Sequence, residues 1–194
     1  MKKSIVYFDQ PGKVNTVDVL EIVKENLNLA DVKYLVIAST TGETAMKAVE
    51  ILGDTGVEII CVGEHTGFWG EDIQKFSGEM KKKLELKGVK VLITSHSLSG
   101  VGRSISNKFK GTSGVEIIAH TLRMMGGEGI KVAVEISIMA ADSGLIPTDQ
   151  EIIAVGGTQG GCDSAVILKA AHMNNFFDLE IREILAKPRQ RTLK

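Results

Sequence analysis

The stretch AVGGTQGGCDSA, residues 154–165, is the first candidate for chemistry because four of its six positions from 156 to 161 are glycine. Glycine lets a ligand approach the backbone more closely than any side chain would allow. Gly156, Gly157 and Thr158 follow a predicted strand, and Ser164 adds a second hydroxyl. With a helix predicted from residue 162 and Asp163 placed to cap it, we expect an anion to bind here.

A second loop with the same character is STTGETA, residues 39–45, which also lies between a predicted strand and a predicted helix. A helix N-terminus carries unpaired N–H groups and about half a positive charge, so it suits a phosphate group. The residues expected to hold the ligand here are Ser39, Thr40, Thr41, Gly42 and Thr44. The alternative is that Thr41 only caps the helix.

Two further loops follow predicted strands. Phe68 and Trp69 stand together after the second strand, and an aromatic side chain at a strand end suits stacking on a flat heterocycle. Ser95 and His96 follow the third strand, and Arg103 lies in the long polar segment behind them. Long loops of this kind are often binding loops, so we expect these three residues to close over the ligand.

Several named motifs are missing from the sequence. No GxxxxGK[ST] stretch is present, and GVGRSI has Ile105 where a dinucleotide fingerprint requires its third glycine. No HExxH, CxxC or GxSxG spacing occurs, so we predict no metal site and no serine hydrolase. His96, Cys162 and Glu135 are left without an assigned chemical role.

Elements that would position these loops alternate along the chain. Strands are predicted at residues 33–39, 57–63, 89–95, 130–141 and 151–157, with an edge strand at 179–187. Helices are predicted at residues 16–29, 42–52, 72–88, 114–125 and 162–172. Because the strands are apolar at consecutive positions, the pattern indicates a mostly parallel sheet between helical layers.

Composition supports one globular α/β domain over residues 1–194, with an N-terminal extension at 1–30 and a basic tail at 188–194. The formal net charge is −1, which does not favour a nucleic-acid partner. The two cysteines lie far apart and charges interrupt every apolar run, so we expect neither a disulfide framework nor a membrane span. A cytoplasmic location is predicted.

The stretches YLVIASTTGETAMKAVEIL and VEIICVG resemble the start of the C-terminal α/β domain of pyruvate kinase. EIIAVGGTQGGCDSAVILKAAH and LEIREILAKPR are similar to the end of stand-alone proteins built on that domain, and this likeness extends over nearly the whole chain. The resemblance implies a three-layer α/β sandwich and assembly into a homo-oligomer. It implies no pyruvate kinase activity, because the catalytic barrel is absent.

Members of the stand-alone group look like binders of flavin mononucleotide (FMN). In regulated pyruvate kinases the matching loop binds a sugar phosphate, although Glu43 of this chain departs from that pattern. We therefore expect a phosphorylated planar small molecule, with FMN as the cofactor, at the carboxyl edge of the sheet. Two alternatives stay open: a flavin-dependent oxidoreductase using His96 or Cys162, and a regulatory module that senses a sugar phosphate.

Overall fold

The structure is a computed structural model that describes residues 2–191, without the side chains of residues 28 and 30. The predicted basic tail at 188–194 is described as far as residue 191, and its last three residues lie outside the described part. Where the tail begins, Pro188 ends a strand and the N–H of Arg189 donates to the carbonyl of Phe8.

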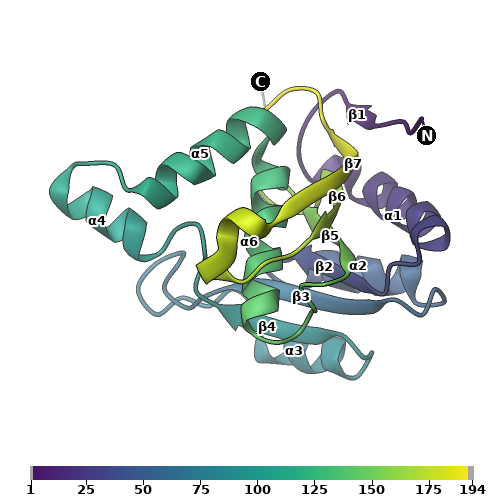
Figure 1. The fold of residues 1–194 in the computed structure, drawn as a ribbon. Coiled ribbons are helices and arrows are strands. Elements are labelled where there is room, and N and C mark those ends of the chain that lie inside the picture. Colours follow the sequence, from purple (N-terminus) through teal and green to yellow (C-terminus); the bar gives the residue numbers. More distant parts are fainter. Residues whose placement is uncertain (1, 192–194) are drawn as a thin grey trace.

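A seven-stranded sheet runs through the molecule in the order β1-β7-β6-β5-β2-β3-β4 (Figure 1). Its strands are β1 (Val6–Phe8), β2 (Tyr34–Ala38), β3 (Glu58–Glu64), β4 (Lys90–Thr94), β5 (Glu151–Gly156), β6 (Ser164–Lys169) and β7 (Glu180–Pro188). β6 pairs antiparallel with both of its neighbours, and every other pairing is parallel. The predicted α/β class with a mostly parallel sheet is confirmed.

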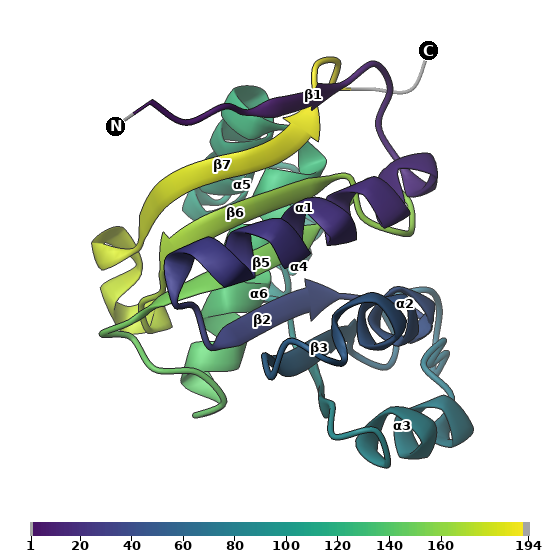
Figure 2. The same ribbon diagram turned by 90° about the vertical axis from the view of Figure 1, so that its right-hand side faces the viewer.

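Helices cover both faces of the sheet. They are α1 (Thr16–Ala30), α2 (Glu43–Leu52), α3 (Gly78–Glu85), α4 (Val101–Phe109), α5 (Gly114–Gly126) and α6 (Glu128–Asp142), with short 3-10 helices at Lys13–Asn15 and Met173–Asp178. Figure 2 shows α1, α2 and α3 in front of the sheet and α6 behind it. Alternate residues of β2 divide the core accordingly, since Leu35 and Ile37 face α1 and α2 whereas Val36 faces α6.

Helix α1 belongs to the main core of the domain. Val19, Leu20 and Val23 are completely buried in the same cluster as Ala45 and Ala48 of α2. This packing follows from the 3.6-residue period of its apolar positions, which places one face of the helix on the sheet. The predicted extension at 1–30 therefore contributes a covering helix of the sandwich.

The strand predicted at 130–141 is wrong, because this segment forms α6. Residues 129–141 are buried at nearly every position, since α6 packs on the sheet on one side and on α5 on the other. A helix surrounded by protein needs no polar face, so its sequence shows no helical period and reads like a buried strand.

The helix predicted at 162–172 is also wrong, because its apolar part is the strand β6. The apolar run SAVILK is too short for periodicity to separate a buried strand from a helix. β7 confirms the strand predicted at 179–187 but does not lie at the edge of the sheet, since β1 pairs with its outer side.

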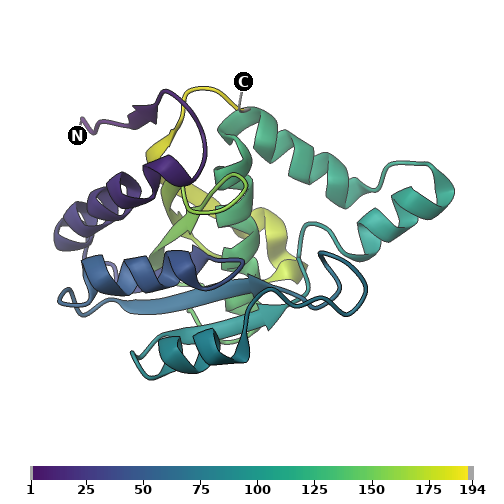
Figure 3. The same cartoon turned by 180° about the vertical axis from the view of Figure 1, so that it is seen from behind.

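Two other segments differ from prediction. The helix predicted at 72–88 is confirmed only over Gly78–Glu85, with Ser77 as its N-cap. The polar segment behind β4 contains α4, which has no buried residue and projects with α5 from the body of the molecule (Figure 3). Across residues 2–191, no helix combines the length and the apolar character that crossing a membrane requires.

Candidate functional site

A cleft of about 810 Å³ opens at the carboxyl ends of β2 and β5. In the sheet, β2 lies between β3 and β5. The chain passes from β2 through α2 to β3 on one side of β2, and it reaches β5, on the other side, after α6. Strand order thus reverses beside β2, and ligands of open α/β sheets bind in the crevice at such a point. The cleft is lined by Lys13, Ala38, Ser39, Thr40, Thr41, Glu43, Thr44, Glu64, Phe68, Trp69, Lys75, Glu128, Val132, Gly157, Thr158, Gln159, Gly160 and Gly161.

Two helix N-termini meet at this cleft from opposite faces of the sheet. The first intrahelical bonds run from Met46 to Gly42 in α2 and from Lys131 to Gly127 in α6. The three amides before Met46 and before Lys131 therefore have no intrahelical carbonyl to pair with. Both ends concentrate partial positive charge at the cleft, which favours an anionic ligand.

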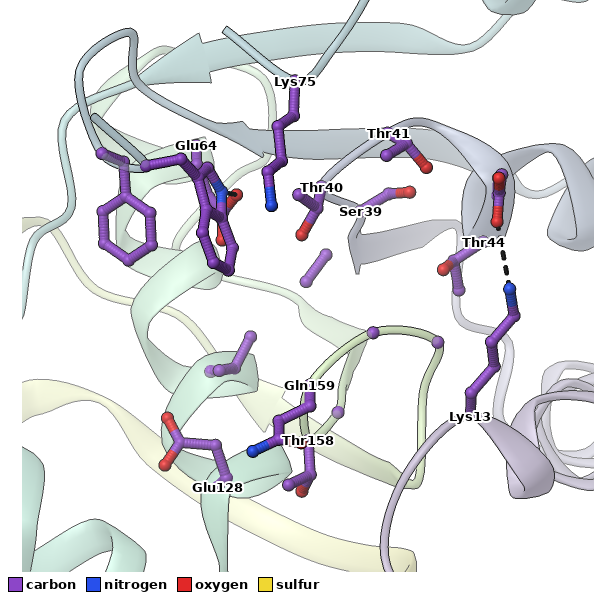
Figure 4. A pocket seen from close by; sticks show the side chains of 18 residues that line it. Lys13, Ser39, Thr40, Thr41, Thr44, Glu64, Lys75, Glu128, Thr158 and Gln159 are labelled. Carbon is purple, nitrogen blue, oxygen red and sulfur yellow. Dashed lines mark hydrogen bonds and ion pairs between the residues drawn. The ribbon is translucent and has the colours of Figure 1, made fainter. Parts of the chain in front are cut away.

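Hydroxyl groups surround the N-terminus of α2. Figure 4 shows Ser39, Thr40, Thr41 and Thr44 on one side of the cleft and Thr158 on the opposite side. The hydroxyl of Ser39 accepts the N–H of Gly42 at 3.0 Å, which fixes the turn into the helix and leaves the O–H of Ser39 free to donate. The structure thus brings together Ser39, Thr40, Thr41, Thr44, Gly157 and Thr158 from the predicted set.

Gly42 and Gly156 belong to that set but have packing roles. A side chain at Gly42 would strike Phe76, Met80 and Leu84, so this residue faces the core between α2 and α3. A Cβ at Gly156 would lie 2.3 Å from the carbonyl oxygen of Gly129, so glycine here allows α6 to rest on β5. Neither residue lines the cleft.

The glycine-rich loop at residues 156–161 belongs to a hairpin between β5 and β6. Gly160 and Gly161 take φ angles of 103° and 64°, the left-handed region that glycine adopts without strain. Because no helix follows, the helix-capping prediction for Asp163 is wrong. Its buried carboxylate instead accepts the backbone N–H of Gly12 at 2.8 Å. The second helix N-terminus at the cleft comes from α6.

Ser95, His96 and Arg103 do not line the cleft. The ring of His96 packs against Phe68, with 4.7 Å between ring centroids. The Nδ1 atom of His96 is buried without a hydrogen-bond partner in the structure. Burial lowers the pKa of His96, with Lys131 and His65 acting in the same direction and Glu135 and Glu64 opposing them. Arg103 is exposed on α4, with its guanidinium 5.9 Å from the centroid of Phe68.

Cys162 is fully buried, and burial raises the pKa of its thiol to about 12. A nucleophilic or redox cysteine needs a thiolate and access to solvent. Cys162 has neither, because its side chain is buried and its thiol stays protonated near neutral pH. Its backbone N–H donates to the hydroxyl of Thr16 at 3.1 Å, which ties the hairpin to α1. The position of Cys162 is that of a small core residue.

Every carboxylate in the cleft has a polar partner. Glu43 forms an ion pair with Lys13 at 3.2 Å across the rim. Glu64 accepts the indole N–H of Trp69 at 2.6 Å. Arg123 makes two hydrogen bonds to Glu128, at 2.5 and 3.1 Å. Glu43 and Glu128 are therefore charge-paired with basic side chains, whereas the indole that partners Glu64 is neutral and does not offset its charge.

Sequence reasoning did not identify Lys13, Lys75, Glu128, Gln159, Gly160 and Gly161 as lining residues. Lys13 reaches the site because the segment before α1 packs on the hairpin, and Glu128 reaches it because α6 is a helix. Of these residues, Lys75 could have been predicted from the sequence, because it follows Phe68 and Trp69 in the segment after the second predicted strand.

No protein-family model matches this chain. A comparison with solved structures finds similarity to the crystal structure of O-ureido-L-serine synthase, at 14% sequence identity and a TM-score of 0.31. The matched region covers 53% of this chain and 31% of the synthase, so it corresponds to less than half of that enzyme.

Proposed function

We propose that this protein binds a phosphorylated planar small molecule, with FMN as the ligand, in the cleft at the switch point of the sheet. The observation that carries the proposal is the convergence of the N-termini of α2 and α6 on one hydroxyl-lined cleft. Phosphate oxygens would accept hydrogen bonds from the unpaired backbone N–H groups of the first turn of α2 and from the hydroxyls of Thr40 and Thr41.

The remaining walls suit the organic part of such a ligand. Ala38 and Val132 contribute apolar surface to the lining, and Phe68 and Trp69 contribute aromatic surface. A volume of about 810 Å³ falls within the range of small-molecule and cofactor sites. An apolar, aromatic region beside an anion site matches a molecule with one flat ring system and one phosphate.

We also propose that the fold is that of the C-terminal domain of pyruvate kinase, as the sequence resemblance implies. The stretch that carries the resemblance folds as β2, the loop with Thr40 and Thr41, and α2. The loop that would bind the effector in pyruvate kinase thus supplies one wall of this cleft.

Titration of the purified protein with FMN, followed by quenching of flavin fluorescence, tests the proposed function. We expect saturable binding, and at least about tenfold weaker binding of riboflavin, which lacks the phosphate. Thr41→Val should weaken FMN binding, whereas Thr121→Val on the exposed face of α5 should leave it unchanged. Absence of saturable FMN binding, or equal affinity for both flavins, would overturn the proposal.

A further inference from the structure

Trp69 is the single tryptophan of the chain, and its indole is fixed on two sides. Its N–H donates to the carboxylate of Glu64 at 2.6 Å, and the ring of Phe68 meets it at 81° with 5.4 Å between centroids. The side chain is nevertheless 48% exposed. An indole that is held in place and lines the cleft is a preformed surface for a flat ring.

The ammonium group of Lys75 covers this indole, 3.3 Å from the ring centroid. Lys75 and Lys13 are the two lysines that line the cleft, and Lys13 is paired with Glu43. Within residues 2–191, no carboxylate forms an ion pair with Lys75. Figure 4 shows its side chain extending into the cleft beside Thr40.

An ammonium ion and a ligand ring cannot occupy the same face of one indole. A hydrogen bond between an ammonium and a phosphate is charge-assisted and stronger than one between neutral groups, whereas a cation–π contact at an exposed site is weak. A ligand with both a flat ring and a phosphate therefore offers Trp69 a ring to stack on and Lys75 a phosphate to pair with, and each is a better partner than the Lys75–Trp69 contact. A ligand with a ring and no phosphate would compensate Trp69 for the lost contact but would leave Lys75 without a new partner.

We propose that Trp69 is the stacking platform for the ring of the ligand and that Lys75 is a ligand-responsive cation, which covers Trp69 in the free protein and pairs with the ligand phosphate in the complex. This inference rests on the proposed function and adds the two residues that select for a ring and a phosphate in one molecule. Lys75 can change partner without a backbone movement, because its four-carbon stem is flexible, whereas Trp69 keeps its place beside Glu64 and Phe68.

The two roles have different signatures toward two ligands. Riboflavin has the ring without the phosphate, so it must displace Lys75 without offering it a new partner. Removal of the Lys75 side chain should therefore strengthen riboflavin binding while weakening FMN binding. A lysine that only contacted phosphate would leave riboflavin binding unchanged.

Dissociation constants for FMN and riboflavin should be measured for the wild type, Trp69→Leu, Trp69→Phe and Lys75→Ala. We expect Trp69→Leu to weaken both ligands about tenfold, which corresponds to loss of one stacking contact. Trp69→Phe should retain most of the affinity. Lys75→Ala should weaken FMN about tenfold and tighten riboflavin a few-fold. Lys47→Ala, on the exposed side of α2, is the matched control and should change neither constant.

The two proposals fail in distinguishable ways. If the wild type binds no FMN, the proposed function falls and this inference falls with it. If FMN binding depends on Thr41 but survives Trp69→Leu unchanged, or if Lys75→Ala leaves riboflavin binding unchanged or weaker, the function stands and this inference is wrong. Trp69 and Lys75 are exposed, so far-ultraviolet circular dichroism should show native folding for every variant.

Discussion

The buried carboxylate of Asp163 accepts the backbone N–H of Gly12 at 2.8 Å, across 151 positions of sequence. Its other oxygen accepts the hydroxyl of Ser164 at 2.8 Å. This contact joins the segment before α1 to the hairpin that forms one wall of the cleft, so it positions Lys13 and Thr158 relative to each other.

Asp163→Ala should therefore lower the free energy of unfolding by about 1–3 kcal/mol, because the N–H of Gly12 is left buried without a partner. Urea denaturation followed by circular dichroism measures this change. Asp149→Ala removes an exposed aspartate with no hydrogen bond in the structure and should have almost no effect. Equal stabilities of the two variants would contradict the assigned role of Asp163.

The ion pair between Lys131 and Glu135 is buried within α6, with 2.5 Å between ammonium and carboxylate. Glu135 also accepts the N–H of Leu98 at 2.9 Å. Lys131→Met should cost about 3–5 kcal/mol, because it leaves an unpaired charge in the core. Adding Glu135→Gln to that variant should recover most of the loss, since glutamine is neutral and can still accept from Leu98. A double variant no more stable than Lys131→Met in urea denaturation would show that the buried charge is not the cause.

Protonation of His96 should destabilise the fold. Burial lowers its pKa below the ordinary value of 6.5, so the unfolded chain binds the proton more readily than the folded protein does. The stabilising contribution is therefore complete above pH 6.5 and is lost as the pH falls through the lower pKa of the folded state. Comparing urea midpoints at about pH 8 and about pH 5 tests this, and His96→Asn should reduce the difference relative to wild type. An unchanged pH dependence in His96→Asn would contradict the assignment.

Both thiols should be inert in the native protein. Burial raises the pKa of Cys61 and of Cys162 to about 12, so neither forms a thiolate near neutral pH. Dithionitrobenzoate should react slowly with the folded protein and should titrate 2 thiols in urea. Stability contributed by the neutral thiols is present below the ordinary pKa of 9.0 and is lost as the pH rises toward 12. Rapid labelling of Cys162 in the native state would contradict this prediction and would support a chemical role for its thiol.

Much of the fold could be predicted because its signals are local. The apolar period of residues 16–29 predicts α1, and the consecutive apolar residues of 33–39, 57–63 and 89–95 predict three parallel strands. Since parallel strands place their carboxyl ends at one edge, these signals also located the loop with Thr40 and Thr41 and the loop with Trp69 at one site.

The remaining elements depend on what surrounds each segment. The sequence IKVAVEISIMAA is apolar throughout, and only its enclosure between α5 and the sheet makes it the helix α6. The run SAVILK becomes β6 because the hairpin returns it antiparallel along β5. Both segments are buried on all sides, and a segment without a solvent-facing side carries no period that distinguishes helix from strand.

Local sequence patterns were sufficient to predict an α/β domain with hydroxyl-bearing loops at the carboxyl edge of its sheet. Long-range packing brings the N-terminus of α6 to the cleft, pairs Lys13 with Glu43 and places Lys75 over Trp69. These contacts join residues from separate elements, and their energies depend on distances that chain order does not fix. Local spacing therefore placed the loops, and packing decided which charges in the cleft are already paired.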